Sequence, residues 1–167
     1  LLSLSDTSGI VAKATLKPGK AVGTSDLLVD VTNSRKVTGY VYADNWGNRY
    51  TGHNRSGVNT SINNVSGAGD KAGIGGLYSG KGMWEYDLSY QRPLDGQGTK
   101  LGISYSQMRY ALGNEFQNLN ASGLSRTTSL WLSKVLQRSR MSNLNAILTY
   151  SNRRLDDRIA YAGTDSR

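Results

Sequence analysis

Two carboxylates on one segment have the spacing in this chain that is best suited to chemistry. Glu85 and Asp87 lie two residues apart within Trp84-Glu85-Tyr86-Asp87-Leu88-Ser89-Tyr90. In an extended strand, side chains two apart share a face, and their Cα atoms lie about 6–7 Å apart. Paired carboxylates at such separations carry acid–base hydrolysis in some enzymes. However, apolar residues alternate strictly with these acids, so the polar wall of a β-sheet explains the pair more simply.

The other residues that could react lack the companions they need. The single histidine, His53, has no neighbouring ligands for a metal, and the chain has no cysteine. Gly67-Ala68-Gly69-Asp70-Lys71 resembles part of a phosphate-binding loop, but it lacks the full motif and the helix that follows it. No serine stands in a G-x-S-x-G elbow that has a histidine partner. We therefore expect no enzymatic activity, no metal and no cofactor.

The chain is basic, with a net charge of +8. A nucleic-acid interface needs a dense basic patch, whereas these basic residues are scattered. The one arginine-rich stretch, Arg153, Arg154 and Arg158, is interrupted by Asp156 and Asp157. This pattern favours a solvated loop, a channel lumen or a lipid headgroup region, and we expect no nucleic-acid partner.

These residues are carried by a series of predicted strands. Alternation of apolar and polar residues recurs along the chain and is broken by Gly, Asn and Asp, which is typical of antiparallel strands joined by turns. From residue 35 onward we predict strands at Val37–Ala43, Arg55–Asn63, Lys71–Tyr78, Met83–Arg92, Thr99–Tyr110, Thr127–Leu136 and Asn143–Asn152. A long loop is expected at Ala111–Arg126, and no closing strand is expected at Gly163–Arg167.

A shorter module precedes this meander. Leu1–Asp6 is consistent with the end of a helix. Val11–Leu16 and Asp26–Thr32 alternate as strands around the turn Lys17-Pro18-Gly19-Lys20, in which Pro fixes φ and Gly is free to take positive φ. These segments predict a hairpin that belongs to a small α+β module.

Strand and loop lengths favour a transmembrane barrel over a soluble sheet. Most of the later strands are about 9–12 residues long, as a tilted membrane strand requires, whereas soluble strands average about 5–6. The connections Gly67–Asp70, Pro93–Gly98 and Arg138–Ser142 fall on one side and are short. Asn45–Gly52 and Ala111–Arg126 fall on the other side and are longer, as in outer-membrane barrels, although Ser79–Gly82 on that side is short.

The alternation also assigns faces. Leu101, Ile103 and Tyr105 are expected to face lipid, and Gly102, Ser104 and Ser106 to face the lumen. On the following strands, the apolar faces are Leu130 with Leu132, and Leu144, Ala146, Leu148 and Tyr150. Several aromatic residues are candidates for the girdles that border the membrane in barrels: Tyr50, Trp84, Tyr86, Tyr90, Tyr105, Tyr110 and Tyr150. Ordinary cross-strand packing explains each of them equally well.

An ordered series of short motifs resembles one family. Leu16-Lys17-Pro18-Gly19 followed by Gly23–Leu27 resembles the last hairpin of the second POTRA domain of two-partner secretion transporters, the hemolysin secretion/activation (ShlB/FhaC-type) outer-membrane proteins. Asp44-Asn45-x-Gly47-x-Arg49-Tyr50-Thr51-Gly52 resembles their first barrel loop, and Asn63–Asp70, with Gly67 and Gly69, resembles the turn that follows it. The resemblance continues through Tyr90–Leu94, Gly98–Ser106, Arg138–Leu144 and Leu155–Asp157.

The resemblance implies a domain division and a function. Residues 1–34 would be the C-terminal part of a periplasmic POTRA domain, and residues 35–167 the first half of an outer-membrane β-barrel that exports a large partner protein, unfolded in transit. Glu85, Asp87, Ser104 and Ser106 would line the channel. Val11, Lys13 and Thr15 would lie on a strand that captures the partner by strand addition, although a purely structural strand is an equal alternative.

Two other functions remain open from the sequence. One is a passive porin-like barrel, against which the POTRA-like hairpin argues. The other is a soluble β-sandwich binding protein, which requires a second sheet to cover the face formed by Leu101, Ile103 and Tyr105.

Overall fold

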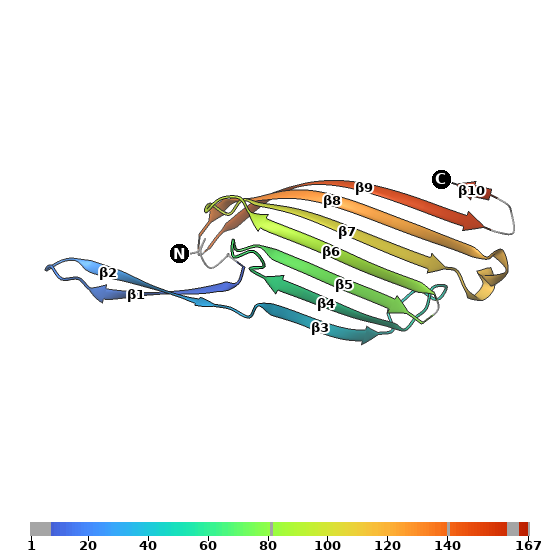
Figure 1. Ribbon diagram of the computed structural model, residues 1–167, viewed down its shortest axis with the longest axis horizontal. Helices are drawn as coiled ribbons and strands as arrows, with labels where there is room; N and C mark the ends of the chain where they lie inside the picture. Colours follow the sequence, from blue (N-terminus) through green and yellow to red (C-terminus); the bar gives the residue numbers. More distant parts are fainter. Residues whose placement is uncertain (1–7, 81, 140, 160–163, 167) are drawn as a thin grey trace.

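The computed structural model describes residues 8–80, 82–139, 141–159 and 164–166, and these residues form a two-stranded hairpin and one broad antiparallel sheet (Figure 1). The hairpin pairs β1 (Ile10–Pro18) with β2 (Ser25–Asn33). The sheet has eight strands in the order β10-β9-β8-β7-β6-β5-β4-β3, so consecutive strands are always neighbours. Its strands are β3 (Val37–Asp44), β4 (Arg55–Asn63), β5 (Lys71–Ser79), β6 (Met83–Pro93), β7 (Lys100–Ala111), β8 (Ala121–Arg138), β9 (Asn143–Ile159) and β10 (Thr164–Ser166).

The predicted mostly-β antiparallel meander is confirmed, and β1 to β7 agree with the predicted strands to within about two residues at each end. The predicted helix end at Leu1–Asp6 lies outside the described residues. A six-residue 3₁₀-helix, η1 (Asn114–Leu119), is the helix found in the described part of the chain. No helix there is long and apolar enough to cross a membrane.

Three predictions at the C-terminal side of the sheet are wrong. The loop expected at Ala111–Arg126 covers only residues 112–120, because β8 begins at Ala121. Likewise, β9 continues to Ile159 instead of ending near Asn152, and Thr164–Ser166 pairs with β9 as a short further strand. The added parts of β8 and β9 are mostly polar on both faces, so their alternation predicts loops. Their backbones nevertheless pair with each other over the register from Ala121↔Ile159 to Thr128↔Asn152.

The register separates the side chains into an apolar and a polar face. One row of paired residues crosses seven strands on the first face: Val37, Ile62, Ala72, Tyr90, Ile103, Leu130 and Tyr150. The face assignment made for β7 to β9 therefore holds, since Leu101 pairs with Leu132, which in turn pairs with Leu148. We call this the outer face.

The outer face has no protein layer over it in the described structure. Ile103 is 49% exposed, Leu130 is 48% exposed and Leu148 is 74% exposed, and the core that is both buried and apolar consists of Ala121. A continuous exposed apolar surface of this extent indicates contact with lipid or another apolar partner, not with water. The second sheet that a soluble sandwich would need does not cover this face among the described residues.

The connections sort to two ends of the sheet as the antiparallel order requires. The turns at residues 64–70 and 94–99 lie at the end from which the hairpin β1–β2 projects, as do the end of β8 and the start of β9 (Figure 1). The loops at 45–54 and 112–120 lie at the opposite end, together with Gly80 and Gly82 between β5 and β6. The linker between the hairpin and β3 bonds to the end of β4: the amide of Asn63 donates to the carbonyl of Lys36 over 2.7 Å, and the Asn63 side chain donates to the carbonyl of Arg35 at 3.1 Å.

Candidate functional site

The second face of the sheet is polar and hollowed, and it is the candidate functional surface. We call it the inner face. One row of neighbours across it carries only hydroxyl side chains and a glycine: Thr38, Ser61, Gly73, Ser89, Ser104, Ser129 and Ser151. Small hydroxyls line the sheet without filling the space in front of it, and one adjacent pair, Ser129 Oγ and Ser151 Oγ, lies within hydrogen-bond distance at 2.8 Å.

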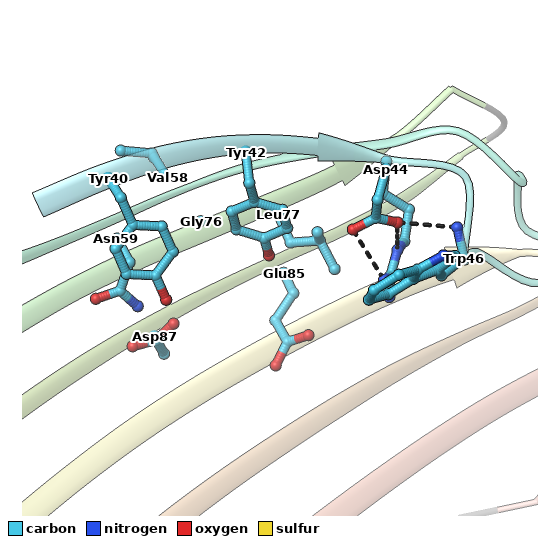
Figure 2. Close-up of a pocket in the computed structure, with 11 residues that line it drawn as sticks. Tyr40, Tyr42, Asp44, Trp46, Val58, Asn59, Gly76, Leu77, Glu85 and Asp87 are labelled. Carbon is cyan, nitrogen blue, oxygen red and sulfur yellow. Dashed lines mark hydrogen bonds and ion pairs between the residues drawn. The ribbon is translucent and has the colours of Figure 1, made fainter.

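The four residues predicted to line a lumen are brought together on this face. Asp87 pairs with Ser106 across β6 and β7, Ser104 pairs with Ser89, and Glu85 lies two residues before Asp87 on the same side. The side chains of Glu85 and Asp87 project into a groove that also contacts Tyr40 and Tyr42 of β3 (Figure 2). The groove is open and mixed in charge, since Asp44 and Arg55 also lie along it.

An ion pair lies at the end of this groove that is nearest to the first loop. Arg55 Nε donates to Asp44 Oδ1 at 2.8 Å, and a second guanidinium nitrogen donates to Asp44 Oδ2 at 3.1 Å. The amide of Trp46 donates to the same carboxylate at 2.9 Å. Because the carboxylate accepts from both the strand β4 and the loop that follows β3, it fixes where that loop leaves the sheet.

Large aromatic side chains on the inner face lie flat on glycines of the neighbouring strand. A Cβ atom on Gly57 would lie 2.4 Å from the Tyr42 ring, and one on Gly102 would lie 2.1 Å from the Trp131 indole. A Cβ on Gly123 would similarly lie 2.4 Å from the ring of Tyr110, whose hydroxyl donates to Asp157 at 2.7 Å. Glycine is required at these positions because the rings occupy the space of a side chain, and the rings are thereby kept close to the wall.

The predicted motif residues lie at the last position of β3, Asp44, and in the first loop: Asn45, Gly47, Thr51 and Gly52. The amide of Gly47 donates to the carbonyl of His53 at 2.9 Å, and Gly52 has φ +117°. A Cβ on Gly47 would lie 1.9 Å from the carbonyl oxygen of Gly52, so the loop closes on itself where only glycine fits. The hydroxyl of Ser79 donates to the carbonyl of Thr51, which anchors the loop to β5.

The first and third loops clasp each other across the β5–β6 hairpin. The Arg49 guanidinium lies 2.5 Å from the Glu115 carboxylate, and the Tyr50 and Phe116 rings have centroids 4.9 Å apart. The amide of Gly113 donates to the carbonyl of Tyr50 at 2.8 Å, and the Asn114 side chain donates to the carbonyl of Arg49. The sequence did not predict this contact, because η1 and the first loop are far apart along the chain.

The turn at the other end contains the predicted Gly67, Gly69 and Asp70. Asp70 is fully buried, and its carboxylate accepts from the Ser66 amide at 3.0 Å and from the Tyr90 hydroxyl at 2.9 Å. Burial alone would raise the pKa of Asp70, but these hydrogen bonds outweigh it and hold that pKa below its ordinary value. Asp70 is therefore a structural anchor that fixes the turn.

The strand predicted to capture the partner is β1 of the hairpin, and its residues do not line the groove. Val11, Lys13 and Thr15 pair with Thr32, Asp30 and Leu28 in the hairpin. The opposite side of the hairpin is apolar and exposed, with Leu16 at 72% and Leu27 at 57%. In the described residues β1 pairs with β2 alone, so its second edge has no strand beside it.

No group of three or more His, Asp or Glu side chains that could hold a metal occurs in the described part of the chain. His53 lies in the first loop and takes part there through its backbone carbonyl. Glu85 and Asp87 contact a tyrosine-lined groove rather than a closed pocket.

Comparison with known proteins identifies the family. Residues 23–163 match the family model described as haemolysin secretion/activation protein ShlB/FhaC/HecB. The chain belongs to this family. The resemblance inferred from the ordered motifs is thus confirmed, and the match extends from the second strand of the hairpin through β9.

Two similar relatives of this ShlB/FhaC/HecB chain are heme/hemopexin transporter proteins HuxB of Haemophilus influenzae. The protein of strain 86-028NP is 29% identical over 157 residues, which is 93% of this chain and 28% of that relative. The protein of strain Rd is 28% identical over 158 residues, with 94% and 28% covered. The chain therefore spans little more than a quarter of the length of these relatives. Their names describe transporters, not enzymes.

Solved structures support the fold. CdiB from Escherichia coli matches with a TM-score of 0.77 and 21% identity, over 93% of this chain and 30% of that chain. CdiB from Acinetobacter baumannii matches with a TM-score of 0.69 and 21% identity, over 98% and 32%. At these identities the likeness shows the fold, that is, the arrangement of the strands and the hairpin.

Proposed function

We propose that this chain forms part of an outer-membrane transporter that exports a large partner protein from the periplasm to the cell surface. Family membership, together with a sheet that is apolar and exposed on one face and polar and hollowed on the other, supports this proposal most strongly. Membrane barrels have this division, with lipid outside and a polar channel inside. We infer no enzymatic role and no cofactor.

The inner face is suited to passing an unfolded chain. The hydroxyl row through Ser104 and Ser129 offers only small polar groups, of which Ser129 and Ser151 bond to each other, and so binds a passing backbone weakly. Glu85, Asp87 and Arg55 give mixed charge instead of a single strong field. We propose that Glu85, Asp87, Ser104 and Ser106 line the channel, and that residues 35–167 belong to the barrel wall.

We further propose that residues 1–34 are the periplasmic end of a POTRA domain and that Val11, Lys13 and Thr15 lie on its partner-binding edge. Strand addition needs an edge whose backbone groups are not already paired, and β1 offers one within the described residues. The alternative is a strand that only completes the module, and crosslinking from Thr15 to the exported partner separates the two.

Labelling of single cysteines tests the channel, because this chain contributes no cysteine of its own. In the full-length protein in cells, Ser106→Cys should react with a water-soluble maleimide, and Ile103→Cys should not. A partner arrested during export should protect Ser106→Cys. Equal labelling of both variants would contradict the two-faced wall.

Comparison of the surface proteome with and without the gene tests export. Loss of one large secreted protein would support the exporter. A change in the uptake of small solutes alone would favour the passive porin instead.

A further inference from the structure

A group of arginines stands on the outer face beside the aromatic residues, where the strands β7 to β9 approach the loop end. Arg126 and Arg154 are direct cross-strand partners, and Arg109 lies on the neighbouring strand β7, one register row nearer the loops. All three are exposed. They line one groove together with Trp84 and Asp156.

Among the described residues that line this groove, arginines outnumber acidic residues. Asp156 is the acidic residue lining it, and its carboxylate lies 3.4 Å from the Arg126 guanidinium. Arg154 therefore faces a like charge directly across the strand pair, an arrangement that destabilises a sheet unless an anion lies between the two. A partner with negative charge would convert this repulsion into attraction.

The position of the groove relative to the apolar band indicates which kind of anion would bind there. On β8, outer-face residues from Lys134 to Arg126 enclose Leu132, Leu130 and Thr128. The eight residue-to-residue steps from Lys134 to Arg126 rise about 27 Å along the strand, or about 20 Å after a tilt of roughly 40°. Basic residues therefore stand at both borders of the apolar band.

An aromatic cluster marks the same border. Trp84 and Tyr86 of β6 stack with ring centroids 5.7 Å apart, and Tyr105 of β7 lies 6.1 Å from Tyr86. Aromatic side chains concentrate at the level of lipid headgroups. Tyr86 lies in the register row that continues through Gln107 to Arg126 and Arg154, so the arginines are at headgroup depth.

We propose that Arg109, Arg126 and Arg154 form a binding site for the phosphate groups of an outer-leaflet lipid headgroup. Guanidinium groups pair with phosphate through two parallel hydrogen bonds, and three of them on adjacent strands match a headgroup that bears more than one phosphate. This inference rests on the proposed outer-membrane location, and it adds a lipid site on the side of the wall that faces away from the channel.

Native mass spectrometry of the full-length protein in detergent tests the site. The probe is lipid A carrying two phosphates, compared with the same lipid after removal of both. The wild type should retain the phosphorylated form. Arg154→Gln should weaken binding about tenfold, as expected for loss of a charge-assisted contact. Asp156→Asn should strengthen binding, because it removes the competing carboxylate.

The chain supplies a matched control. Arg153→Gln makes the same charge change one residue away, but Arg153 lies on the inner face, where its Nε donates to Thr127 Oγ1 at 3.3 Å. Binding should be unchanged in this variant. An equal loss in Arg153→Gln, or equal binding of the dephosphorylated lipid, would overturn the proposal.

Two further measurements make the outcome decisive. Complete displacement of the lipid by inorganic phosphate at the same concentration would identify a site for free anions and would also overturn the proposal. Export of the partner is measured in parallel: normal export with unaltered lipid binding in Arg154→Gln disproves the lipid site alone, whereas a wild type that exports nothing disproves the proposed function.

Discussion

The hydroxyl of Tyr90 on β6 donates a hydrogen bond of 2.9 Å to the buried carboxylate of Asp70, which lies in the turn before β5. The contact ties the turn to the strand that pairs with β5, since Tyr90 is the register partner of Ala72. It also places an ionised group where stability must depend on pH.

Loss of the Tyr90 hydroxyl should destabilise this end of the sheet. Tyr90→Phe keeps the ring on the outer face but removes one hydrogen bond to a charged group, which costs roughly 1.5–3 kcal/mol. The midpoint of urea unfolding of the full-length protein in lipid vesicles measures the effect. Tyr78→Phe, on the outer face of β5, is the matched control and should shift the midpoint much less.

Acid should weaken the wild type through the same carboxylate. An ordinary Asp has a pKa of 3.8, and the pKa of Asp70 is lowered in the folded chain. The stabilisation from ionised Asp70 is therefore complete above about pH 4 and is lost as the pH falls through the folded-state pKa. Urea midpoints at successive pH values should drop less steeply in this range for Asp70→Asn. Parallel curves for the two proteins would contradict this assignment.

A methyl group on Gly102 should displace Trp131. The added Cβ would lie 2.1 Å from the indole, so Gly102→Ala must move the ring off the wall and toward the channel, at a cost of about 1–3 kcal/mol. We expect a lower unfolding midpoint and slower export of the partner. Gly76→Ala is the control, because its nearest neighbour, Val58 Cγ1, is 3.8 Å away. Equal effects of the two changes would mean that the ring does not depend on Gly102.

The sequence predicts the strands well where one face is apolar and the other polar. β4 is predicted from Arg55 to Asn63 as observed, because its turns contain residues suited to positive φ, such as Asn64 and Gly67. The sequence does not predict the loop-side ends of β8 and β9, because neither face is apolar there. Local alternation does not encode the backbone pairing between these two strands.

The candidate site was partly predictable for the same reason. Alternation alone places Glu85, Asp87, Ser104 and Ser106 on one face, and the structure confirms that they share it. The pairing of Gly102 with Trp131 depends on register between strands, which alternation does not fix. A glycine within a strand is the signal that could have indicated a close approach.

The clasp between the loops should depend on its rings more than on its ion pair. Arg49 and Glu115 are 54% and 67% exposed, so their pair contributes about 0.2–1 kcal/mol. Phe116→Ala should therefore increase protease cleavage within residues 112–120 more than Glu115→Gln does, because it removes the contact with Tyr50. A larger effect of Glu115→Gln, measured at low and at high salt, would assign the clasp to electrostatics instead.

An arginine placed on each face in turn provides the strictest test of which face of the sheet contacts lipid. Ile103 is 49% exposed on the outer face, and arginine there should cost about 2–4 kcal/mol if the residue lies near the middle of a bilayer. Ser104→Arg makes the same addition one residue along, on the inner face, where water can solvate the charge. We expect Ile103→Arg to fold into vesicles poorly and Ser104→Arg to fold normally, as followed by the change in gel mobility on heating. Normal insertion of Ile103→Arg would mean that this face does not contact lipid, because no other feature of β7 would compensate for a charge held in hydrocarbon.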